Sequence, residues 1–188
     1  MGSLHTVLDA HRLKPDNVSM PLPDRIDDLD ARIITLFTQR PGVGVLGASR
    51  ELGVARGTVQ ARLDRLERRG VVTGFAPQVD PAAMGYPVTA FCTLEIGQGR
   101  GHDPVVAHLS GIPEVLEAYT ITGQGDLMIR VVARDNTDLQ RVIDRVVEAG
   151  LVTRASTVIA LATQIPYRTL PLVGSAGSAQ GEGDPGGG

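Results

Sequence analysis

The sequence contains little cysteine and few aromatic residues. Cys92 is the only cysteine among 188 residues, which excludes an intramolecular disulfide and favours a reducing, cytoplasmic setting. Because Cys92 lies in an apolar run, we expect it to be a small buried side chain on a strand. Three Phe, three Tyr and no Trp leave the hydrophobic cores to be built from Val, Leu, Ile and Ala.

Several functional signatures are missing as well. No apolar run is long enough to span a bilayer, and no charged and then apolar leader follows Met1. The four histidines show no spacing typical of a metal site. A phosphate-binding loop, a dinucleotide fingerprint and a nucleophile–base pair are also lacking. The sequence therefore predicts a soluble protein that is not an enzyme and that holds no metal or cofactor.

Acidic residues slightly outnumber basic ones overall, but positive charge is concentrated in one stretch. The net charge of −3 argues against a surface that is coated uniformly for nucleic acid. Between Arg50 and Arg69, however, six arginines stand against only three acidic residues. A local cationic face on a mildly acidic protein is typical of DNA contact through a single surface.

The cationic stretch predicts two helices joined by a tight corner. A short helix ends at Leu52, Gly53 and Val54 form the turn, and a longer helix continues to Arg69. Helical spacing on one face of the second helix is shown by Val59, Leu63 and Leu66. Such a pair favours a helix-turn-helix module, whose second helix enters the major groove of DNA.

The residues around this pair complete a small domain. A preceding helix is predicted over 27–39, with Asp27 as its N-cap and Asp30 placed favourably in its first turn. After the second helix, 70–75 predicts a helix stop and a short hairpin. Three helices and a small wing form a winged-helix arrangement.

From Tyr86 onward the pattern changes to strands that alternate with helices. We expect strands over 88–96, 115–122, 127–133 and 153–164, and helices over 104–110 and 137–148. The order βαββαβ is that of the ferredoxin-like split motif, an antiparallel sheet backed by two helices. The predicted fold class is therefore α+β.

These patterns divide the chain into five parts. In order they are an N-terminal extension (1–23), a winged helix-turn-helix DNA-binding domain (24–75), a linker (76–85), the βαββαβ domain (86–166) and a glycine-rich tail (167–188). We expect the tail to be disordered, because its composition offers too little apolar surface to bury.

Five motifs in register resemble the Lrp/AsnC family, the feast/famine transcription regulators. They are Ile26-Asp-Asp-Leu-Asp30, Arg62-Leu-Asp-Arg-Leu-Glu-Arg-Arg-Gly-Val71, Val79-Asp-Pro-Ala-Ala-Met-Gly85, Pro113-Glu-Val115 and Thr122-Gly-Gln-Gly-Asp-Leu127. The resemblance extends from about Ile26 to Pro166. It implies a RAM/ACT-like second domain that binds a small effector and forms oligomers. One departure is Ala55, which stands where the family usually has a serine N-cap and so forfeits about 1 kcal/mol of capping.

The second helix of the pair supplies the predicted DNA contacts. Its exposed first turn contains Arg56, Thr58 and Gln60, and we expect Arg56 to contact guanine and Gln60 adenine. The phosphate contacts are assigned to Arg62, Arg65 and Arg69. The alternative is a solvated helix face whose arginines pair with neighbouring acidic residues.

The turn between the two central strands is the predicted effector site. The resemblance implies that this loop binds the α-amino and α-carboxylate groups of an amino acid at an interface between subunits. The predicted effector residues are Thr122, Gly123, Gln124, Gly125, Asp126, Thr153 and Ser156. A structural alternative remains, in which the glycines only permit the turn and the aspartate only caps it.

The leading interpretation is a sequence-specific DNA-binding transcription regulator that responds to a small effector, with an amino acid expected. Its partners are double-stranded DNA, the effector and further copies of the chain, as a homodimer and a higher oligomer. Two alternatives stay open. One is an architectural DNA-binding protein without an effector, and the other is a metabolite-sensing regulatory subunit of an enzyme.

Overall fold

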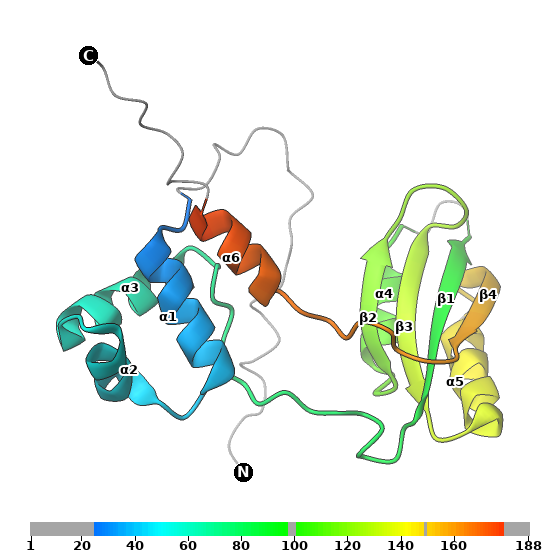
Figure 1. Ribbon diagram of the computed structural model, residues 1–188. Helices are drawn as coiled ribbons and strands as arrows, with labels where there is room; N and C mark the ends of the chain where they lie inside the picture. Colours follow the sequence, from blue (N-terminus) through cyan, green and yellow to red (C-terminus); the bar gives the residue numbers. More distant parts are fainter. Residues whose placement is uncertain (1–24, 98–100, 149, 179–188) are drawn as a thin grey trace, which may run out of the picture. The chain divides into compact units, whose positions relative to one another are not determined.

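The computed structural model describes residues 25–97, 101–148 and 150–178, and it divides into two compact units. The first unit combines the residues up to Phe75 with those from Tyr167 onward, and the second is formed by Ala76–Pro166 (Figure 1). None of the helices in these described ranges has the length and hydropathy needed to cross a membrane. The predicted N-terminal extension lies outside the described residues.

Three helices of the first unit match the predicted helix-turn-helix arrangement. They are α1 (Asp28–Gln39), α2 (Gly44–Leu52) and α3 (Arg56–Arg68). The Asp27 side chain accepts a hydrogen bond from the Asp30 N–H at 2.9 Å, and the Asp30 carboxylate accepts one from the Asp27 N–H, which forms a capping box. The corner after α2 is Gly53, whose φ of 69° is costly for other residues. As predicted, Ala55 offers α3 no side-chain cap.

The core of this unit consists of apolar side chains that pack between the three helices. Its buried residues are Ile33, Leu36, Ala48, Val59 and Leu63. A second cluster contains Ile26, Ala31 and Leu66, so that the start of α1 contacts the far end of α3. These two clusters together set the position of α3.

The predicted hairpin at 70–75 does not form in the described part of the chain. Its residues form a turn and bends and do not pair as strands. The reason lies in the end of α3, where Gly70 takes a φ of 68°. The Val71 and Val72 N–H groups both donate to the Leu66 carbonyl, at 2.9 and 3.2 Å. These amides therefore terminate the helix and are not available for a β-ladder.

The prediction of a disordered tail over 167–188 is wrong for its first part. Leu170–Ser178 forms a helix, α6, which packs against α1. Val173 packs against the cluster of Ile26, Ala31 and Leu66, so that α6 gains from tertiary contact the burial that its own composition does not suggest. Residues 179–188 of the predicted tail lie outside the described residues.

The second unit has the predicted βαββαβ order. Its elements are β1 (Val88–Ile96), α4 (Asp103–Ser110), β2 (Val115–Thr120), β3 (Leu127–Ala133), α5 (Asn136–Glu148) and β4 (Val152–Ala160). The antiparallel sheet has the strand order β2-β3-β1-β4. β2 and β4 are shorter than predicted, since they end at Thr120 and Ala160.

The sheet buries only one of its faces. Alternate residues such as Cys92, Leu94, Ile129 and Val131 pack against α4 and α5, which cover that face (Figure 1). Cys92 is buried as predicted, and burial raises the pKa of its thiol. The central position of β1 places its end beside both the β2–β3 turn and β4, which brings together the residues of a pocket described below.

Candidate nucleic-acid interface and ligand pocket

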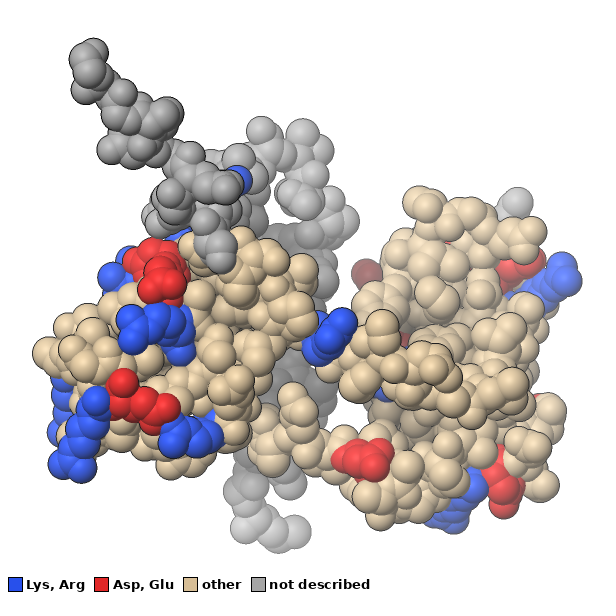
Figure 2. Space-filling view, in the orientation of Figure 1, with Lys and Arg blue, Asp and Glu red and all other residues tan. Residues whose placement is uncertain are grey.

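The first turn of α3 is exposed and cationic. Arg56, Thr58 and Gln60 are all exposed, whereas Val59 between them is fully buried. Arg56 forms no ion pair with any other described residue, and the Gln60 Nε2 donates to the Asp64 Oδ1 at 2.7 Å. In Figure 2, basic side chains lie along the edge of the first unit that contains α2 and α3, with acidic side chains between them. This turn can therefore present an unpaired guanidinium and an amide to a ligand.

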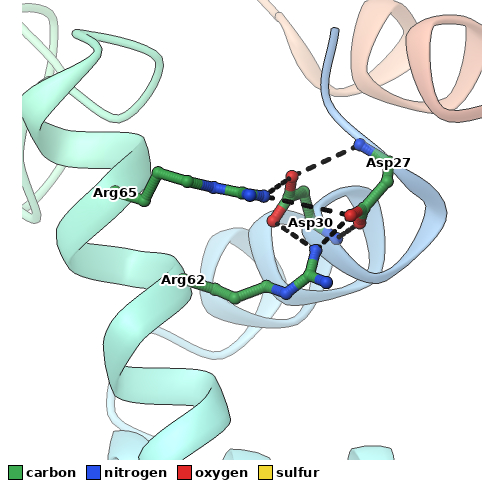
Figure 3. A network of polar contacts seen from close by, with 4 residues as sticks. All are labelled: Asp27, Asp30, Arg62 and Arg65. Carbon is green, nitrogen blue, oxygen red and sulfur yellow. Dashed lines mark hydrogen bonds and ion pairs between the residues drawn. The ribbon is translucent and has the colours of Figure 1, made fainter. Parts of the chain in front are cut away.

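Two arginines further along α3 face the start of α1 instead (Figure 3). Arg65 Nη2 lies 2.6 Å from the Asp30 Oδ2, and Arg62 Nη1 lies 3.0 Å from the Asp30 Oδ1. Arg62 also pairs with Asp27. The Asp30 side chain is fully buried, so the two guanidinium groups supply the charge that compensates its carboxylate.

This network shifts the pKa values of Asp27 and Arg62. The hydrogen bond from Arg62 lowers the pKa of Asp27 below its usual value, although burial acts in the opposite direction. The same contact raises the pKa of Arg62. Both shifts favour the charged forms, so the pair of Asp27 and Arg62 stays ionised at neutral pH.

The network changes the interpretation of two predicted DNA contacts. The sequence assigned Arg62 and Arg65 to phosphates, but the structure engages both with aspartates that lie more than thirty residues away in the chain. The only sequence signal for this pairing was the acidic first turn of the helix predicted over 27–39, which is α1. Arg69, the third predicted phosphate contact, is partly exposed and forms no ion pair within the described ranges.

A pocket lies beside the turn that joins β2 and β3. It is a cavity of about 440 Å³ lined by Glu95, Ile96, Gly97, Gly123, Gly125, Asp126 and Thr153. Four of the predicted effector residues are in this lining, whereas Thr122, Gln124 and Ser156 are not. Sequence reasoning missed the three residues at the end of β1, because only the strand order brings that end next to the turn.

Asp126 fastens this turn to β1. Its Oδ2 accepts a hydrogen bond from the Ile96 N–H at 2.7 Å, and its own N–H donates to the Leu94 carbonyl at 2.8 Å. Gly125 is held tightly at the same place, since an added Cβ would lie 2.4 Å from the Thr93 Cγ2. The carboxylate of Asp126 thus connects the turn to the end of β1.

Apart from the Asp126 carboxylate, the polar groups at the pocket are backbone groups and the side chains of Glu95 and Thr153. Gly123 and Gly125 have φ values of 104° and 88°, and neither carries a side chain that would cover the neighbouring peptide groups. The Thr153 hydroxyl donates to the Glu95 carbonyl at 3.1 Å. The Glu95 carboxylate lies 3.9 Å from Arg154, and both side chains are exposed. The pocket therefore offers a carboxylate and bare backbone to a small polar molecule.

Comparison with known proteins identifies both units. A winged helix-turn-helix DNA-binding model matches residues 26–73, and an Lrp/AsnC ligand binding domain model matches residues 89–170. The HTH-type transcriptional regulator AldR of Mycolicibacterium smegmatis is 30% identical over 120 residues, which cover 63% of this chain and 70% of AldR. The chain belongs to the Lrp/AsnC family. It is thus a transcriptional regulator with a helix-turn-helix domain and a ligand-binding domain.

Solved structures of this family have the same fold. E. coli AsnC matches with a TM-score of 0.71 and 26% identity, and the match covers 78% of this chain and 99% of AsnC. A feast or famine regulatory protein from M. tuberculosis, complexed with L-methionine, matches with a TM-score of 0.68 and 26% identity. That match covers 76% of this chain and 97% of the M. tuberculosis protein. Within the described residues of this Lrp/AsnC chain, no group of three or more His, Cys, Asp and Glu could hold a metal ion.

The ion network makes a prediction about pH. Asp27→Asn retains a good N-cap but removes the charge that pairs with Arg62, so we expect the free energy of unfolding of the first unit to fall by about 1 kcal/mol at neutral pH. Because the pKa of Asp27 is lowered in the folded protein, its stabilising effect is present above the ordinary value of 3.8 and is lost as the pH falls through the lowered value. Urea unfolding at neutral pH and at about pH 2.5 measures both effects.

The matched control is Asp28→Asn, which removes a neighbouring charge that forms no ion pair with the described residues. We expect this variant to differ less from the wild type at neutral pH. A stability deficit of Asp27→Asn that stays the same at both pH values would contradict the assigned ion pair.

Proposed function

We propose that α3 reads DNA in the major groove and that the βαββαβ domain adjusts this reading when it binds an amino acid. The observation that carries the proposal is the exposed first turn of α3, at the corner of a helix-turn-helix, where Arg56 forms no ion pair with the residues that the structure describes. A guanidinium in this position can donate two hydrogen bonds to a guanine edge. Membership of a family of transcriptional regulators supports the same assignment.

The proposal divides the predicted DNA-binding residues into a group that contacts DNA and a group that holds α3 in place. Arg56 and Gln60 contact bases, Thr58 and Arg69 contact the backbone, and Gln60 exchanges its hydrogen bond to Asp64 for one to a base. Arg62 and Arg65 keep α3 in place through Asp27 and Asp30. Any phosphate contact by these two arginines uses the N–H groups that the aspartates leave unoccupied.

The effector is proposed to bind in the pocket beside the β2–β3 turn. Its volume of about 440 Å³ suits a small ligand. The exposed Glu95 carboxylate can hold an α-ammonium group, and the peptide groups of Gly123 and Gly125 can hydrogen-bond an α-carboxylate. The L-methionine complex of the similar M. tuberculosis protein supports an amino acid as the ligand class.

A homodimer is proposed to form through the uncovered face of the sheet. This face exposes Phe91, Tyr119 and Val158, whose side chains are 37%, 54% and 64% accessible. The cross-strand pairing of Phe91 with Val158 makes the apolar surface continuous across two strands. A second copy of the same face is the proposed partner, because a two-fold symmetric dimer supplies two α3 helices for the two half-sites of a symmetric DNA site.

The proposal also places the protein in the cytoplasm, with its DNA, and assigns it no catalytic step. The named relatives are transcriptional regulators, which supports that part of the proposal. An architectural DNA-binding protein would share the α3 surface but would not respond to any ligand at the pocket. The ligand experiment below separates these two functions.

The DNA contacts can be tested on the duplex that the wild type selects with the highest affinity from a random library. Arg56→Ala should weaken binding by about 1–3 kcal/mol and relax the preference for guanine at one position, because a bidentate base contact is lost. The control is Arg154→Ala, which removes an equal charge from the second unit and should leave the affinity unchanged. If Arg56→Ala and Gln60→Ala both retain the affinity and the sequence preference, α3 does not read DNA in the proposed way.

The effector site can be tested by thermal unfolding in the presence of each of the twenty amino acids. At a hundredfold excess over Kd, a specific ligand should stabilise the protein by roughly 2.7 kcal/mol and raise Tm by a few degrees. Gly125→Ala should abolish this rise, since its added Cβ would also lie 3.1 Å from the Leu94 carbonyl oxygen. Gly85→Ala is the control, because it has a positive φ but lies outside the pocket. A rise that persists in Gly125→Ala argues against this pocket.

The proposed dimer can be tested by sedimentation. Val158→Asp places a charge on the uncovered sheet face and should convert the dimer into a monomer, since it would leave an unpaired charge inside the interface. Val106→Asp is the control, because Val106 is similarly exposed, at 42%, but lies on α4. Dissociation by Val106→Asp but not by Val158→Asp would contradict the proposed interface.

A further inference from the structure

The first unit is built from two separate parts of the chain. The chain leaves this unit after Phe75, forms the complete second unit, and returns at Tyr167 to add α6. Figure 1 shows α6 packed alongside α1. The family model of the ligand-binding domain ends at residue 170, the first residue of α6, so the rest of this helix lies outside both family matches.

The contact between α6 and α1 is close at one point. A Cβ added at Gly177 would lie 2.8 Å from the Cβ of Ala31 and 3.8 Å from the Asp27 carbonyl oxygen. One turn earlier, Val173 packs against the cluster that contains Ile26 and Leu66. Because Leu66 belongs to α3, the side chains of α6 and α3 share one hydrophobic cluster.

The part of α1 that α6 contacts also carries the ion network. Asp27 and Asp30 lie on this first turn and bind Arg62 and Arg65 of α3. Release of α6 would uncover Ala31 and remove an apolar neighbour from Leu66. Asp27 and Asp30 would then lie on a turn with fewer packing contacts. As a result, α3 would lose some of the contacts that fix its orientation.

The chain also connects α6 to the effector pocket. Thr153 of the pocket lies on β4, and β4 ends at Ala160. Residues 161–169 then lead directly to the start of α6. A change at β4 can therefore reach the first unit along this connection, in addition to the linker that follows α3.

We propose that α6 is a clamp that holds the DNA-binding unit in its binding-competent form and transmits the state of the effector domain to α3. This inference rests on the function proposed above and adds a coupling element that the family matches do not include. In the clamped state α6 is docked on α1, and in the released state the first turn of α1 is loosened. An effector shifts this equilibrium only if it binds the two states with different affinity.

The test uses two identical substitutions on one helix in the full chain. Gly177→Ala introduces the short contact with Ala31, whereas a Cβ at Gly174 would meet no atom of the described residues within 4 Å. Both changes raise helix propensity, so a loss confined to Gly177→Ala reflects the packing of α6 on α1. A chain that ends at Thr169 removes the clamp altogether.

Hydrogen exchange of the first turn of α1 is the first measurement, because it does not depend on DNA. We expect faster exchange in Gly177→Ala and in the truncated chain, and wild-type exchange in Gly174→Ala. The second measurement is DNA affinity with and without the amino acid that stabilises the wild type. We expect the truncated chain to bind DNA at least about fivefold more weakly and to lose the response to the amino acid.

Unchanged exchange in both Gly177→Ala and the truncated chain would overturn the clamp. Faster exchange with unchanged DNA affinity and an unchanged amino-acid response would overturn the coupling. A wild-type protein that binds no DNA would refute the function proposed above, and the exchange pattern would still decide whether α6 holds α1.

Discussion

The buried carboxylate of Asp30 is the constraint on which the DNA-binding unit depends. A charge that is removed from water is tolerated only if it is paired, and here Arg62 and Arg65 reach across from α3 to pair with it. The cationic helix is therefore not free to turn or slide along α1 without leaving a buried charge uncompensated. The orientation of the exposed first turn, with Arg56 at its start, follows from this electrostatic requirement together with the burial of Leu66.

The ligand-binding domain uses an aspartate in a related way. Asp126 binds the backbone of β1 and thereby holds the β2–β3 turn against the end of that strand. Because the side chain is used internally, the proposed recognition at the pocket falls to peptide groups and to the exposed Glu95. In both units an acidic side chain holds the element that presents the proposed functional surface, and other groups are proposed to contact the ligand.

The order of the elements along the chain connects the two units twice. The ligand-binding domain is inserted between α3 and α6, so both of its ends are connected to the DNA-binding unit. In an arrangement with one linker, a change in one domain can be absorbed by that linker. Here a second connection ends in a helix that packs on Ala31 and on the cluster of Leu66, close to the network around Asp30. The hydrophobic and ionic contacts that position α3 are therefore adjacent to α6.

The sequence by itself determined the features that depend on local periodicity and local turns. The helical spacing of Val59, Leu63 and Leu66, the Gly53 corner and the βαββαβ order all follow from residues that are close together in the chain. Only the tertiary structure decided that Arg62 and Arg65 pair with aspartates, that Glu95 joins the pocket and that α6 folds. Each of these depends on groups far apart in the sequence, and their pairing or burial is stable only after the elements have packed.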